Sequence, residues 1–154
     1  MRFLLFRVAD DRYALDVGHV VEVLPLVHVK QIPGAPQGVA GIFNYRGSPV
    51  PVIDLCDMML GRPSRTRLST RIVLVKYRDP AANGHLLGLI AEHATETIRL
   101  DAADFVASGV SDGRAPYLGP VATDPRGIIQ WIAVDALLSE SVREVLFRPA
   151  EGLA

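Results

Sequence analysis

The sequence has little of what covalently or metal-stabilised folds require. Its 154 residues include a single cysteine, Cys56, so no internal disulfide can form and a reducing compartment is expected. The four histidines include no pair with the helical spacing of a zinc site. No hydrophobic run approaches about 18 residues, and the first residues do not resemble a secretory signal. We therefore expect a cytoplasmic protein that needs no metal and does not enter a membrane.

An excess of charge of one sign is also lacking. Sixteen Lys and Arg residues face seventeen Asp and Glu residues, which gives a net charge of −1. A nearly neutral chain has no bulk electrostatic reason to bind nucleic acid or an anionic membrane. One basic run, Arg62–Arg67 followed by Arg71, could contact an anion, although a solvated loop is the simpler interpretation. Hydrophobic residues make up 49% of this small chain, and the apolar surface that it cannot bury favours a partner site.

Motifs of catalysis are missing as well. There is no Gly-x-Ser-x-Gly, Walker or Gly-x-Gly-x-x-Gly pattern. Cys56 lies among hydrophobic residues and is most simply a buried small side chain. Asp54 and Asp57 could share a helix face, but capping and exposure explain them more simply than acid–base catalysis. The sequence therefore favours a binding module over an enzyme, and it indicates no cofactor.

Short strand-like segments dominate what is present. Alternating or continuous hydrophobic patterns predict strands near residues 2–8, 13–17, 20–24, 72–77, 86–91, 95–100, 117–122 and 128–132. The segment Pro49–Ile53 is predicted to be extended, and its two prolines place it at an edge or terminal strand position. A short helix is predicted at 54–61, with Asp54 as its N-cap and Gly61 just past its end. Helical spacing returns over 134–146, where a capping box starting at Ser141 predicts a break.

The order of these elements repeats along the chain. Both halves contain a hairpin followed by a short segment with a glutamate, Glu22 or Glu96. A second hairpin with an Arg-Gly turn comes next, and a segment that begins with an aspartate follows it. Short, numerous strands indicate small β-barrels, and two such units would gain a sufficient core by packing together or exchanging segments. The sequence predicts two lobes of about five strands, with a groove between them.

Two charged residues lie in strongly apolar surroundings. Glu22 is flanked by valines, and Arg46 follows Phe43-Asn44-Tyr45. Charges in such settings tend to be paired or to lie at a partner surface, although two ordinary surface charges would look the same.

The surrounding motifs resemble the CheW-like coupling domain. The resemblance rests on the following segments: Val20-x-Glu22-Val23, Pro33-x-x-Pro36, Gly38-Val39-x-Gly41-Ile42-x-Asn44-x-Arg46-Gly47 and Val50-Pro51-Val52-Ile53-Asp54-Leu55. It implies a mainly β fold of two intertwined five-stranded barrels of the Src-homology-3 type, with short helices and a C-terminal helix. A single domain is expected over 1–148, followed by a disordered tail at 149–154. Tyr45, Gln130 and Glu92 depart from the residues usual in this family.

The resemblance also implies a function. Such a domain is a non-enzymatic adaptor that couples the cytoplasmic tip of a methyl-accepting chemoreceptor to the regulatory domain of a CheA-type histidine kinase, recruited to membrane-receptor clusters. The sequence is similar to those of adaptors from alternative pathways, such as the Wsp surface-sensing system. The expected receptor contacts are Val20, Glu22, Val23, Asn44, Arg46 and Gly47, and the expected kinase contacts are Leu87, Leu89 and Ile90. The alternatives are a decoy that binds receptors without coupling a kinase, and a small-ligand sensor that uses the groove between the lobes.

Overall fold

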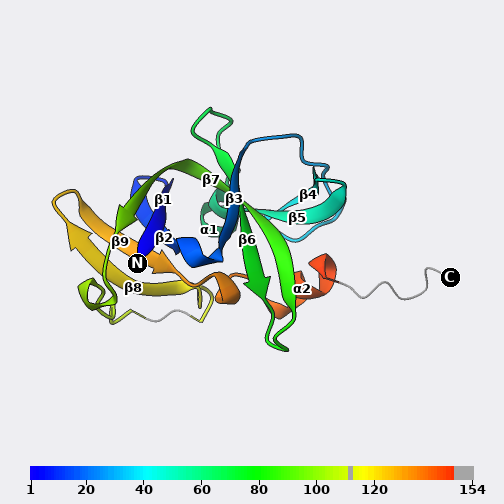
Figure 1. Ribbon diagram of the computed structural model, residues 1–154. Helices are drawn as coiled ribbons and strands as arrows, with labels where there is room; N and C mark the ends of the chain where they lie inside the picture. The colour runs from blue at the N-terminus through cyan, green and yellow to red at the C-terminus, as the bar shows by residue number, and fades with distance from the viewer. Residues whose placement is uncertain (111–112, 148–154) are drawn as a thin grey trace.

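The computed structural model describes residues 1–110 and 113–147 (Figure 1). Nine strands, two α-helices and three 3-10 turns form within these residues. The predicted tail at 149–154 and the domain boundary at 148 lie outside them. In chain order the elements are β1 (Arg2–Val8), β2 (Asp11–Asp16), η1 (Val17–His19), β3 (Val20–Pro25), β4 (Val39–Tyr45), β5 (Ser48–Asp54), α1 (Leu55–Leu60), β6 (Arg71–Arg78), β7 (Gly84–Arg99), η2 (Ala102–Asp104), β8 (Leu118–Asp124), β9 (Gly127–Ile132), η3 (Val134–Ala136) and α2 (Glu140–Leu146).

The long strand β7 belongs to two five-stranded sheets. Its first half lies in the order β3-β6-β7-β5-β4, which we call the first lobe. Its second half lies in the order β7-β1-β2-β9-β8, which we call the second lobe. In Figure 1 the β4–β5 hairpin and the β8–β9 hairpin accordingly lie on opposite sides of the molecule.

The two lobes have the same pairing pattern. A central hairpin, β6–β7 or β1–β2, pairs on one side with an antiparallel strand, β3 or the second half of β7. On its other side it pairs with a parallel strand, β5 or β9, which forms a further hairpin with β4 or β8. Each lobe thus takes strands from both halves of the sequence. The predicted mainly β fold, with two intertwined and repeated five-stranded units, is confirmed.

One prediction about individual strands was wrong, and another holds only in part. The segments near 86–91 and 95–100 are one strand, because β7 continues through a distortion at His93 (φ 54°) as its pairing passes from β6 to β1. The predicted edge or terminal position of Pro49–Ile53 holds for the proline end of β5 only. Pro49 and Pro51 pair only with β4, whereas the proline-free end from Val52 to Asp54 also pairs in parallel with β7.

The two α-helices are set by their capping residues. As predicted, the side chain of Asp54 accepts hydrogen bonds from the first turn of α1, and Gly61 ends the helix in the left-handed region at φ 76°. The predicted break before the last helix is also present. Its cap is Ser139 rather than Ser141, since the N–H of Val142 donates to the Ser139 hydroxyl over 3.3 Å.

The largest cluster of buried side chains extends through both lobes. It joins Phe6 and Leu15 of the second lobe to Val75 and Leu89 of the first, and the C-terminal Leu137 packs on the same cluster. Because this core is shared, the two lobes hold each other in place and present fixed outer surfaces.

Candidate partner-binding site

The β4–β5 turn of the first lobe displays Arg46. Arg46 (φ 51°) and Gly47 (φ 88°) both lie in the left-handed region, as the most common two-residue hairpin turn requires. The Asn44 side chain supports the turn by accepting a hydrogen bond from the Gly47 N–H over 2.7 Å. The turn leaves 75% of the Arg46 side chain exposed, so its guanidinium is available to a partner.

Arg46 forms an ion pair with Glu22 of β3. One guanidinium nitrogen, Nη2, donates to Glu22 Oε1 over 3.0 Å. The two charged residues in apolar surroundings are therefore paired, through one guanidinium nitrogen rather than two. Such an exposed pair adds little to folding stability, because its charges are screened by water, so orientation of the guanidinium is its main effect.

Tyr45 completes this arrangement. The Arg46 guanidinium carbon lies 5.1 Å from the centre of the Tyr45 ring, and the Tyr45 hydroxyl donates to Glu22 Oε1 over 3.4 Å. The tyrosine therefore supports both members of the pair. The sequence analysis noted Tyr45 only as a departure from the family pattern. Its place directly before an arginine in a tight turn was the signal that could have revealed its role.

The remaining residues of the expected receptor surface are less accessible. Val20 and Val23 are partly buried and pack against the main core. Between them, Val21 lies where the pairing of β3 with β6 shifts register, and it is 41% exposed. Val21 is therefore the valine of β3 best placed to contact a partner, and the sequence analysis did not single it out.

A largely apolar hollow adjoins the turn. Its volume is about 650 Å³, within the usual range for ligand and peptide pockets. Asn44 and Gly47 belong both to its wall and to the expected receptor surface. Its other lining residues are Val27, His28, Lys30, Ile42, Phe43 and Pro49.

The side chains expected to contact a kinase are buried. Leu87 and Leu89 have no exposed surface, and Ile90 is 7% exposed, because the two leucines pack in the core shared by both lobes and Ile90 packs in a second cluster on the first lobe. This burial gives no support to a kinase contact there. The uninterrupted apolar run of residues 86–91 was the available signal, since such runs are typical of strands covered on both faces.

The second lobe carries a matching ion pair. Arg126, in the β8–β9 turn, donates from Nη2 to Glu96 Oε1 of β7 over 3.3 Å. Glu96 lies opposite Leu5 just as Glu22 lies opposite Leu74 in the first lobe. The repeat in the sequence predicted the matching turn and the matching strand but not this contact.

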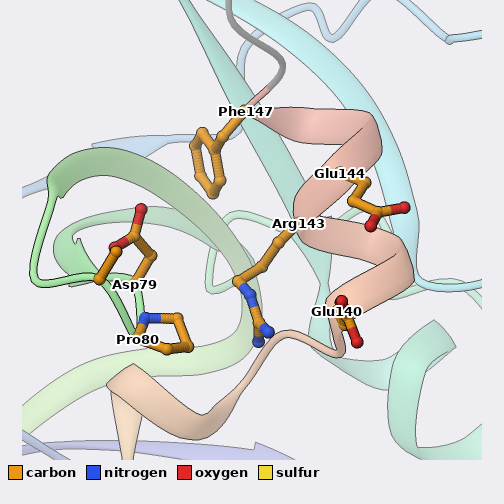
Figure 2. A pocket seen from close by; sticks show the side chains of 7 residues that line it. Asp79, Pro80, Glu140, Arg143, Glu144 and Phe147 are labelled. Carbon is orange, nitrogen blue, oxygen red and sulfur yellow. The ribbon is translucent and has the colours of Figure 1, made fainter.

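Two further hollows lie near the C-terminal segment. One, of about 430 Å³, separates the β6–β7 turn from α2, and Figure 2 shows Phe147 and Arg143 of the C-terminal segment facing Asp79 and Pro80 across it. Two of its charged groups have internal partners. Arg143 donates to the Leu138 carbonyl over 2.7 Å, and the hydrogen bond from His85 holds the pKa of Asp79 below its usual value.

The other hollow, of about 500 Å³, lies between the lobes. Its wall includes Ile53 and Met58 on one side and Tyr117 and Leu137 on the other. It is the candidate for the groove that the repeat predicted, since its walls come from β5 and α1 and from the segments before β8 and after β9. Over residues 1–110 and 113–147, no three His, Cys, Asp or Glu side chains gather as a metal site would require. No helix in this part of the chain is both long and apolar enough to cross a bilayer.

The fold and the exposed Glu–Arg pair define a class of two-barrel, all-β interaction domains. The profile of the CheW-like domain matches residues 2–142, and this chain belongs to that family. A chemotaxis protein CheW of Helicobacter pylori is 27% identical over 104 residues, which cover 68% of this chain and 60% of that protein. Protein PilI of Pseudomonas aeruginosa is 32% identical over 74 residues, covering 48% of this chain and 42% of PilI.

A solved structure agrees with the family. The scaffolding protein TtCheW of Thermoanaerobacter tengcongensis superposes with a TM-score of 0.78 at 26% identity, covering 92% of this chain and 89% of that one. The fold of this chain is therefore that of a CheW-like domain, and the proteins it resembles include chemotaxis and scaffolding proteins. The two relatives named above are matched over only 60% and 42% of their own lengths.

Proposed function

We propose that this chain is a non-enzymatic adaptor that couples a methyl-accepting chemoreceptor to a CheA-type histidine kinase. The observation that carries the proposal is the Glu22–Arg46 pair, displayed on a tight turn next to an apolar hollow. A charged group held beside apolar surface suits a partner that combines both properties. The cytoplasmic tip of a receptor, an amphipathic helical hairpin, is such a partner.

On the receptor side, the helix lies across the β4–β5 turn. Its apolar stripe contacts Val21 and the hollow that begins at Asn44 and Gly47, while an acidic or carbonyl group accepts from Arg46. Glu22 and Tyr45 hold the guanidinium in one orientation, so little side-chain entropy remains to be lost on binding.

On the kinase side, the second lobe is the better candidate surface. Exposed hydrophobic side chains occur on β8, on β9 and on the segment that bridges to β8, namely Leu118, Ile128 and Val106. A related barrel of the kinase regulatory domain would pack against this surface. Since receptor and kinase then occupy different lobes, the adaptor can hold both at once and bias the kinase between its states.

The direct test is a bridging experiment with purified components. A receptor cytoplasmic fragment is immobilised, and a CheA-type kinase is added with and without this protein. Retention of the kinase only in the presence of the adaptor supports the proposal. Ile128→Glu should abolish kinase retention while leaving adaptor binding to the receptor intact, and Arg46→Glu should abolish both. Arg99→Glu, an exposed strand position outside the proposed surfaces, serves as the matched control.

The bridging experiment tests the decoy alternative, and mass spectrometry tests the ligand-sensor alternative. A decoy would bind the receptor but never retain a kinase. A small-ligand sensor would use the hollow of about 500 Å³ between the lobes, and native mass spectrometry of the purified protein would then reveal a bound molecule.

Neither relative reported above is a Wsp protein, so assignment to a Wsp-type pathway stays a prediction, as does recruitment to receptor clusters at the membrane.

A further inference from the structure

The basic loop after α1 is firmly anchored. Buried Asp54 accepts hydrogen bonds from the Ser64 N–H and hydroxyl over 2.8 and 2.6 Å. Buried Glu92 accepts from the Arg65 N–H over 2.7 Å. Because backbone groups carry these contacts, the Arg65 and Arg67 side chains project from a fixed frame. The loop is exposed at Arg65 and Arg67, as the simpler interpretation expected, but its start is held in place by the two buried carboxylates.

This loop forms one wall of a polar pocket of about 340 Å³. The opposite wall comes from β1 and β7, where Ala9 and His93 both lie in the left-handed region, at φ 55° and 54°. Ala9 is the one apolar residue among the lining residues that the structure describes. The complete lining is Arg7, Ala9, Asp10, Arg62, Arg65, Arg67, Ser69, Thr70, Glu92 and His93.

The pocket has an excess of positive charge. Four guanidinium groups face two carboxylates, Asp10 and Glu92, in a chain whose net charge is −1. Glu92 is occupied internally. Its Oε1 accepts from the Cys56 thiol over 3.4 Å and lies 3.6 Å from Arg62, while its Oε2 accepts from the Arg65 N–H. Burial alone would raise the pKa of Glu92, but these contacts hold it below its usual value.

The other arginines of the pocket have no carboxylate partner. Among the described residues, no acidic side chain lies within ion-pair distance of the Arg7, Arg65 or Arg67 guanidinium. Like charges gathered on a fixed frame repel one another, and a bound anion would remove that repulsion. Guanidinium groups match the geometry of phosphate oxygens with paired hydrogen bonds.

We propose that this pocket binds a phosphate group, carried by inorganic phosphate, pyrophosphate or a small phosphorylated molecule. The polar lining argues against an apolar peptide, and no Phe, Tyr or Trp is among the described lining residues, so His93 carries the one ring on which a nucleobase could stack. Arg7 and Arg67, from opposite walls, would close on the phosphate oxygens. The site does not involve the Glu22–Arg46 surface, so phosphate binding can be tested independently of receptor coupling.

The test is isothermal titration calorimetry of the whole chain with pyrophosphate, at constant ionic strength in a chloride buffer. We expect saturable binding of one pyrophosphate per chain. The double variant Arg7→Gln/Arg67→Gln should weaken it at least about tenfold. Arg2→Gln/Arg99→Gln removes two exposed arginines from β1 and β7 outside the pocket, and it should bind as the unmodified protein does. Amide shifts in ¹⁵N spectra should be confined to Ala9, His93 and the loop.

Further titrations identify the source of the phosphate group. Tighter binding of a phosphate monoester than of inorganic phosphate would indicate a small phosphorylated molecule, whereas the reverse order would indicate the free ion. The proposal is overturned if millimolar pyrophosphate gives no saturable heat, or if both double variants weaken binding equally, since the effect would then be bulk electrostatics. It is also overturned if a hexaglutamate peptide binds in an Arg67-dependent manner and pyrophosphate does not, because the pocket would then receive an acidic protein segment.

Discussion

Glu22 and Glu96 hold the same position in the two copies of the structural repeat. Each lies on a strand at the edge of a central hairpin, and each accepts a hydrogen bond from an arginine in the turn of the following hairpin, Arg46 or Arg126. Among residues 1–110 and 113–147, a tyrosine lies beneath the guanidinium of the first pair but not of the second, and an apolar hollow adjoins the first pair. The second pair is therefore a natural internal control for the first.

Reversing the charges tests the role of the first pair. We expect Arg46→Glu to weaken binding of a receptor fragment at least about tenfold, and Glu22→Arg added to it to restore part of that loss. The free energy of unfolding should change by less than about 1 kcal/mol, since the pair is exposed. Binding is measured by calorimetry and unfolding by urea titration. The matched cycle at Glu96 and Arg126 should leave receptor binding unchanged, and zero coupling energy between Glu22 and Arg46 would contradict their pairing in function.

Replacing Tyr45 tests how the guanidinium is oriented. Tyr45→Phe keeps the ring beneath Arg46 and loses only the long hydrogen bond to Glu22, so receptor binding should fall no more than about twofold. Tyr45→Leu removes the ring face as well and should cost about 0.5–1 kcal/mol of binding free energy. Calorimetry with the same receptor fragment measures both. Equal affinities of the leucine and phenylalanine variants would show that the ring does not act through Arg46.

Local features of the fold could be predicted because they depend on neighbouring residues. The helix between Asp54 and Gly61 is specified by its own caps, and the β4–β5 hairpin by Arg46-Gly47. The repeat could be found because both copies place the same kinds of residue in the same order. The candidate site was predicted from the resemblance to the family motif around Glu22 and Arg46. The hydrophobic pattern alone does not show that these two segments are in contact.

Features that depend on the neighbouring strand could not be predicted in the same way. β7 passes from one lobe to the other without ending, because the distortion at His93 redirects it while backbone pairing continues. Leu87 is buried because it belongs to the cluster that also contains Leu15 and Leu137, and no local pattern specifies neighbours so distant in the sequence. The Arg126–Glu96 contact likewise joins residues 30 positions apart in the sequence.

The buried Arg12 makes stability depend on pH through Asp124. Both Asp124 carboxylate oxygens accept from the Arg12 guanidinium, one of them over 2.9 Å, and the Arg126 N–H also donates to this carboxylate. The contact with Arg12 lowers the pKa of Asp124 to about 2. Because the folded pKa lies below that of the unfolded chain, near 3.9, the stabilisation is present above about pH 4 and is lost as the pH falls toward 2.

Asp124→Asn should therefore lower the free energy of unfolding by about 1–2 kcal/mol at pH 7, a value reduced by the partial exposure of the carboxylate. The difference from the unmodified protein should shrink as the pH approaches 2. Urea titrations across this range measure it, with Asp11→Asn, at an exposed position on the same strand as Arg12, as the control. A difference that stays constant down to pH 2 would show that the charge of Asp124 is not its source.

Cys56 should be chemically inert while the protein is folded. Its side chain has no exposed surface, and burial, together with the hydrogen bond to Glu92, raises the pKa of the thiol to about 11. At pH 8 the reactive thiolate is therefore scarce and also inaccessible. We expect Ellman's reagent to label Cys56 only at the rate of unfolding, and to label it at once in denaturant. Ser48→Cys in a Cys56→Ala background places a thiol at an exposed strand position and should react rapidly in the folded state. If native Cys56 reacted as fast as this control, the segment around α1 would have to open in the folded protein, and the anchoring of the basic loop through Asp54 and Glu92 would be contradicted.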